Sequence, residues 1–173
     1  MERETIGRPL YRTPSFLIAL SLIVITVLLM ISVYTRFLQL HFLIGPFYIH
    51  HWLSWIGSLF IAFFTPIYFV AKRRFPSKFK KILQVHVFGN LFAAMFISIH
   101  FTQHISRSPQ SYPDLGTGIV LYASVLLLVV TGFFLRYQIG RSLRKGWIFL
   151  HTGATTAFYL VIVVHILHGL AII

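Results

Sequence analysis

The histidines are the residues of this sequence that could carry chemistry, because imidazole binds metal ions and titrates near neutral pH. The chain has nine of them, at positions 41, 50, 51, 86, 100, 104, 151, 165 and 168. Four form two pairs with the same spacing of 14 positions, which are His86 with His100 and His151 with His165. On an α-helix, 14 residues rise about 21 Å and make almost four turns, so both members of a pair share one face. A metal–imidazole bond is only about 2 Å long, so each histidine needs a partner on another helix.

Long apolar helices are the elements that must position these histidines. Of the 173 residues, 57% are hydrophobic and 10% are charged, whereas soluble domains contain about 25% charged residues. An apolar stretch of about 20 residues crosses a bilayer as a helix. We therefore expect one all-α integral membrane domain over residues 1–173, with transmembrane helices at about 14–36, 49–71, 82–104, 117–137 and 147–171. The last four would form a four-helix bundle, and the first would be an extra N-terminal helix.

The basic residues predict how these helices are oriented. Lysine and arginine are abundant in the N-terminal segment and in the loops around 72–81 and 136–145, and they are sparse in the other two loops. Cytoplasmic loops carry the excess of positive charge in membrane proteins, so we expect a cytoplasmic N-terminus and an external C-terminus. Helices 82–104 and 147–171 then run in the same direction. This would bring His86 level with His151 near the inside, and His100 level with His165 near the outside.

Facing histidines in an apolar bundle suit the two axial positions of a haem iron, because a porphyrin is flat, large and apolar. The sequence thus predicts two b haems, an inner one between His86 and His151 and an outer one between His100 and His165. Small or aromatic residues on the same helix faces would pack against the haems, namely Gly89, Ala93, Ala154 and Phe158. The alternative is a set of buried histidines that bond to neighbouring carbonyl groups or line a water path.

The composition excludes several other kinds of site. There is no cysteine, which rules out thiolate-bound iron–sulfur clusters and covalent haem attachment through C-x-x-C-H. No glycine-rich phosphate-binding motif occurs, and helices and short loops account for the sequence, so we expect no nucleotide or flavin domain. The net charge of +12 is explained by the positive loops of a membrane protein. We therefore expect lipid and no nucleic acid as partners.

The spacing H-x13-H on two parallel helices resembles the membrane di-haem b-type cytochromes. This broad group includes the cytochrome b of quinol-oxidising complexes, ferric-reductase-like transmembrane domains and small prokaryotic cytochrome b subunits. The segment "WIFLHTGATTAFYLVIVVHILHGL" (147–170) is similar to the last ligand helix of the small prokaryotic kind. The resemblance covers roughly 49–171 and implies electron transfer across a prokaryotic cytoplasmic membrane, with quinone or other redox subunits as partners. It implies an electron-transfer subunit of an oxidoreductase complex, because the sequence lacks the flavin and nicotinamide domain of the reductases.

The remaining histidines and several basic residues fall near the two ends of this predicted arrangement. Four histidines on the predicted outer side could form a quinone site or contact haem propionates, namely His104, His168, His50 and His51. His104 and His168 are also alternative ligands to His100 and His165. Basic residues that could contact propionates are Arg144 and Lys145 near the inner level and Arg107 near the outer level. Two rival functions stay open: an outer-face oxidoreductase of quinol or metal ions, and a histidine-lined transporter of metal ions or protons without haem.

Overall fold

The structure, a computed structural model, describes residues 13–106 and 116–169. These residues form the helices α1 (Pro14–Tyr34), α2 (Ile49–Arg74), α3 (Phe79–Ile105), α4 (Gly116–Tyr137) and α5 (Arg144–Gly169). Within the described ranges, five helical spans are long and apolar enough to cross a membrane. The predicted all-α class and the five predicted spans are confirmed, with ends that differ by a few residues. The predicted end of the last span, at 171, lies outside the described residues.

The ends of the helices follow from local chemistry. α1 begins at Pro14, a first-turn position where the missing N–H of proline costs no hydrogen bond. α2 continues beyond its predicted end to Arg74, and three basic side chains in its last turn complement the negative end of the helix dipole. Short 3-10 turns, η2 (Pro76–Lys78) and η4 (Arg141–Leu143), join α2 to α3 and α4 to α5. Before the second turn, Gly140 adopts a φ of +62°, a conformation that glycine adopts without strain.

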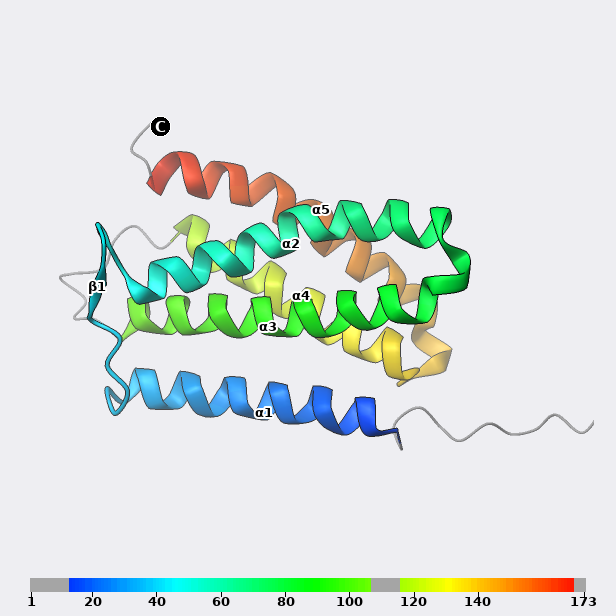
Figure 1. Ribbon diagram of the computed structural model, residues 1–173, viewed down its shortest axis with the longest axis horizontal. Coiled ribbons are helices and arrows are strands. Elements are labelled where there is room, and N and C mark those ends of the chain that lie inside the picture. Colours follow the sequence, from blue (N-terminus) through cyan, green and yellow to red (C-terminus); the bar gives the residue numbers. More distant parts are fainter. Residues whose placement is uncertain (1–12, 107–115, 170–173) are drawn as a thin grey trace, which may run out of the picture.

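The helix α3 lies at the centre of the arrangement. It packs against α1, α2 and α4, while α5 packs mainly against α4. Figure 1 shows α1 on one side of α3 and α2 on the other, with α3 and α5 running in the same direction. The helices α2 to α5 thus form the predicted four-helix bundle as two helical hairpins, α2–α3 and α4–α5, and α1 lies outside it against α3.

The first helical hairpin is held together closely at Gly57 of α2. A Cβ atom at this position would lie 2.7 Å from the carbonyl oxygen of Ala93, which is a backbone atom of α3. Small residues at such positions let membrane helices approach each other, and the close contact supplies the packing energy that lipid does not. A larger residue at position 57 would therefore push α2 away from α3.

An apolar layer fills the middle of the bundle. Phe158 of α5 is fully buried there, and Ala93 and Ile97 of α3 are almost fully buried beside it. These residues belong to one cluster with side chains from α2 and α4, such as Ile61 and Val125. The layer separates the two halves of the bundle's length.

A two-stranded hairpin, which the sequence analysis did not predict, precedes α2. Strand β1 (Leu43–Ile44) pairs antiparallel with β2 (Phe47–Tyr48), and the turn between them contains Gly45 at a φ of +63°. The indole N–H of Trp52 donates a hydrogen bond of 2.9 Å to the carbonyl oxygen of Ile44. Strands of two residues are too short to give a recognisable alternation of polar and apolar residues. We call this end of the bundle the hairpin end, and the opposite end, with η2 and η4, the basic end (Figure 1).

Candidate functional site

The four equally spaced histidines lie at two levels of the bundle. His86 and His151 lie toward the basic end, near enough for a charge on the ring of His151 to be felt at His86. His100 interacts in the same way with His165 at the level toward the hairpin end. The helical rise over 14 residues separates the two levels by about 21 Å. The parallel direction of α3 and α5 thus places the members of each predicted pair at the same level of the bundle, and their role as paired ligands stays a prediction.

Two threonines of α4 hold the histidines of α5 in the same way. Thr131 lies 2.9 Å from Nδ1 of His151, measured from its Oγ1 atom. Thr117 lies 3.0 Å from Nδ1 of His165, again through Oγ1. The two threonines are 14 positions apart, as are the two histidines. The same polar contact is thus repeated once at each level.

A glycine follows each of these threonines and faces the same imidazole. A Cβ atom at Gly132 would lie 3.2 Å from Cε1 of His151. The corresponding distance from Gly118 to Cε1 of His165 would be 3.5 Å. The Thr-Gly dipeptide thus provides both a hydrogen-bonding group and the space in which the ring lies. These four residues were not among the predicted site residues, although the sequence repeats "TG" at 117–118 and at 131–132.

The hydrogen bonds of Thr131 fix the protonation of His151. The Thr131 hydroxyl donates its single proton to the carbonyl oxygen of Leu127. It can therefore only accept from the imidazole, so Nδ1 of His151 carries the proton and donates it. A neutral imidazole with its proton on Nδ1 has its lone pair on Nε2. Nε2 of His151 is thus the atom that can bind a metal.

His86, the partner of His151, lies in a different setting. Its ring stacks on Tyr68 of α2 with 4.0 Å between the ring centroids. The carboxamide nitrogen of Asn90, one turn further along α3, lies 3.2 Å from Nδ1 of His86. The Oδ1 atom of Asn90 is buried and has no hydrogen-bond partner among the described residues. A half-turn of this carboxamide would let Oδ1 accept a hydrogen bond from Nδ1–H of His86, which would again leave Nε2 with the lone pair.

Three of the four residues expected to pack between the levels lie in the interior of the bundle. Ala93 and Ala154 are almost fully buried, and Phe158 is fully buried. Gly89 instead contacts α2, because the ring of Phe60 occupies the space that a Cβ atom of Gly89 would need. Gly89 therefore serves the contact between α2 and α3 in this structure.

Four histidines gather at the hairpin end. His50 and His51 open α2, while His100 and His104 lie in the last two turns of α3. Their rings lie 4.3 to 5.7 Å apart, measured between centroids. One ring nitrogen from each of the four lies within 4.8 Å of those of the other three. We call these four residues the histidine cluster.

The other residues predicted for the outer side either are not members of this cluster or lie outside the described residues. His168, near the end of α5, is exposed and is not a member of the cluster. His41, in the segment before the hairpin, lies 2.9 Å from the carboxamide nitrogen of Gln103, measured from its Nε2 atom. Arg107, which was expected to contact a propionate, lies outside the described residues.

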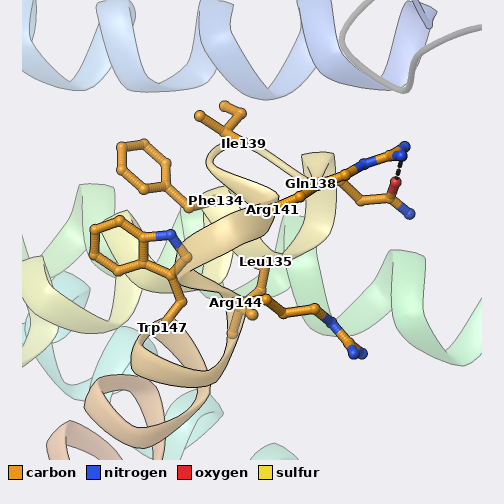
Figure 2. Close-up of a pocket in the computed structure, with 7 residues that line it drawn as sticks. All are labelled: Phe134, Leu135, Gln138, Ile139, Arg141, Arg144 and Trp147. Atoms are coloured by element: carbon orange, nitrogen blue, oxygen red, sulfur yellow. Dashed lines mark hydrogen bonds between the residues drawn. The ribbon is translucent and has the colours of Figure 1, made fainter.

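The basic residues predicted for the inner level lie at the basic end. Arg144 and Lys145 are exposed in the first turn of α5. Arg144 also lines a pocket of about 340 Å³ at the junction of α4 and α5. Figure 2 shows Phe134 and Trp147 on one side of this pocket, and the polar ends of Arg144, Arg141 and Gln138 on the other. Arg141 and Arg144 therefore line this pocket, and Lys145 follows Arg144 in the sequence.

Comparison of the chain with models of known protein families, with curated proteins and with solved structures finds no match.

Proposed function

We propose that this chain is a transmembrane electron-transfer protein that holds two b-type haems. Each haem would lie between one histidine of α3 and one of α5, with His86 and His151 at the basic end and His100 and His165 at the hairpin end. The observation that carries the proposal is the repeated contact of Thr131 and Thr117 with the two α5 histidines. Two imidazoles held in the same way at two levels are what two equivalent ligand sites require.

The residues at the two levels fit a haem. Each level offers two imidazoles, which are the usual axial ligands of low-spin b haems, and the chain offers no thiolate. The Nδ1 proton of His151 is held by Thr131, as the second nitrogen of a metal-bound histidine usually is held by a neighbouring acceptor. Gly132 and Gly118 leave room beside the two α5 imidazoles. A bound haem would supply the one-electron chemistry, which the side chains of this protein cannot.

The chain's own residues would orient the cofactors and keep water away from them. Thr131 fixes the proton of His151 on Nδ1, so that Nε2 carries the lone pair and can bind a metal. The apolar layer around Phe158 lies between the levels and excludes water from the middle of the bundle. In this proposal the N-terminus is cytoplasmic. Electrons would pass to or from a quinone in the bilayer or a partner redox subunit of a prokaryotic cytoplasmic membrane.

A visible spectrum of the purified full-length protein tests this proposal. The dithionite-reduced protein should show the α band of a b-type cytochrome, and pyridine haemochrome analysis should give two haems per chain. Substitution of His151 or His165 by alanine should lower this ratio to one in each case, because each change removes one axial ligand. The matched control is His168→Ala, which removes an exposed histidine from the same helix and should leave both haems bound.

The same measurement separates the rival functions. A protein that carries no Soret band after production with ample haem would refute the electron-transfer proposal and favour a histidine-lined transporter. Loss of haem on substitution of His104 or His168, with His100 and His165 dispensable, would refute the ligand assignment at the hairpin end. Turnover of a quinol or a metal ion by the isolated chain would identify it as an oxidoreductase in its own right.

A further inference from the structure

The histidine cluster at the hairpin end contains more imidazoles than a haem level can use. An axial pair at this level would need His100 and His165 alone. Three members of the cluster remain, and all three belong to one compact group of rings with His100. We propose that His50, His51 and His104 form a separate binding site for a divalent first-row transition-metal ion.

Two helix ends bring the three ligands together. His50 and His51 are neighbours in the first turn of α2, and their ring centroids are 4.3 Å apart. His104 comes from the last turn of α3, and its ring centroid lies 5.7 Å from those of both His50 and His51. Because α2 and α3 pack against each other along their length, this meeting point is fixed by the closely packed helical hairpin.

The protonation of His50 suits a ligand. Its Nδ1 atom lies 3.2 Å from the carbonyl oxygen of Leu40, and a carbonyl oxygen can only accept a hydrogen bond. Nδ1 of His50 therefore carries the proton, and the lone pair is on Nε2. Metal-bound histidines are held in this way by a backbone carbonyl or carboxylate on their second nitrogen. His50 is also fully buried, so its ring has one fixed position.

The distances between the donor atoms are close to those of a metal site. Metal–nitrogen bonds of about 2.0–2.1 Å in a tetrahedral site place the nitrogen atoms about 3.4 Å from one another. The cluster nitrogens lie within 4.8 Å of one another, so side-chain rotations of the half-buried His51 and His104 that bring the nitrogens closer by up to about 1.4 Å would complete the geometry. With three protein ligands, the fourth position would stay open for water or for an exchanging ligand.

The charges and the donor type define which ions fit. No carboxylate lies in the described part of the chain, since the three acidic residues are Glu2, Glu4 and Asp114. Neutral imidazoles are therefore the donors, and they favour Zn²⁺, Cu²⁺, Ni²⁺ and Fe²⁺ over Mg²⁺ and Ca²⁺, which prefer oxygen ligands. Protonated imidazoles in such a small space would repel one another, so binding should weaken as the pH falls below the usual range of histidine.

Equilibrium dialysis of the purified full-length protein against Zn²⁺, followed by elemental analysis, tests the site. The wild type should bind one zinc at this site, and His51→Ala or His104→Ala should weaken that binding by at least about tenfold. The matched control His168→Ala should bind zinc like the wild type. The iron content measured in the same samples reports haem, and it should not change in the His51 and His104 variants.

Two results keep this proposal separate from the proposed function. Equal zinc binding by the wild type and by a His51→Ala/His104→Ala double variant would overturn the metal site, whatever the iron content. Zinc binding without any haem would leave the metal site standing and overturn the electron-transfer proposal. Should the variants fail to fold, Cu²⁺ added to the wild-type protein provides a second measurement. Its electron paramagnetic resonance spectrum should show hyperfine splitting from imidazole nitrogens, and a spectrum without such splitting would contradict the site.

Discussion

Substitution of Thr131 by valine gives the sharpest test of how the α5 histidines are held. Valine has nearly the same shape as threonine but lacks the hydroxyl that lies 2.9 Å from Nδ1 of His151. Thr131 is fully buried, so water cannot easily replace the lost acceptor. A buried donor without a partner costs about 1–3 kcal/mol. An unliganded imidazole can rotate or exchange its proton to avoid this cost, whereas an imidazole with Nε2 on iron cannot.

The cost should therefore appear as weaker haem binding at the basic-end level. It corresponds to a loss of roughly 5- to 150-fold in affinity, which a titration of the purified protein with haem would resolve. Redox titration gives a second measurement, because a donated Nδ1 proton makes imidazole a stronger ligand for ferric iron. We expect the midpoint potential of one haem to rise in Thr131→Val, and the potential of the other haem to stay at its wild-type value.

Two further variants make this test specific. Thr131→Ser retains the hydroxyl and should restore both the affinity and the potential. Thr117→Val should produce the same effects at the other level, through His165. Wild-type haem affinity and wild-type potentials in Thr131→Val would refute the reasoning, because the hydroxyl would then have no part in holding the ligand.

Three other predictions concern packing in the bundle. Gly132→Ala should lower haem content more than Gly118→Ala, because its Cβ would approach the imidazole to 3.2 Å rather than 3.5 Å; equal effects would show that the rings shift freely. Phe158→Ala empties a fully buried site and should lower the free energy of unfolding by an amount toward the lower end of about 3–5 kcal/mol. The lower end is expected because the hydrophobic effect contributes little to helix packing in lipid. Unfolding in SDS would measure this free energy. Tyr137→Phe removes a hydrogen bond of 2.7 Å to the carbonyl oxygen of Ser15 and should cost about 1 kcal/mol in the same assay, and an unchanged stability would mean that α1 is held by apolar contacts alone.

The sequence predicted the helices well because hydropathy over some 20 residues reflects the whole length of a span. It also predicted that α3 and α5 run in the same direction, because loop charge gave the direction of each span, and the constant rise of a helix then places His86 level with His151 and His100 level with His165. It did not predict the role of Thr117 and Thr131. A threonine in an apolar helix commonly bonds to its own backbone, and only the packing of α4 against α5 shows that these two reach a histidine of the neighbouring helix.

Other misses have the same origin, since they depend on contacts between helices. Gly89 lies on the face of α3 that a helical projection assigns to the histidines, yet Phe60 of α2 reaches across to cover it. His50, His51 and His104 were expected together on the outer side, and the structure gathers these three around His100, whereas His168, which was expected with them, is not a member of the group. The hairpin at 43–48 was missed because its strands have only two residues each.

The two histidines of each level belong to different helical hairpins, and this has a consequence for biogenesis. His86 and His100 enter the membrane with α2 and α3, whereas His151 and His165 enter later with α4 and α5. Each helical hairpin closes through its own short turn and its own helix contacts. It can therefore insert into the membrane before the other helical hairpin has been synthesised. A group that needs one ligand from each hairpin can be bound only after the second has docked. Cofactor insertion would then be a late checkpoint of assembly.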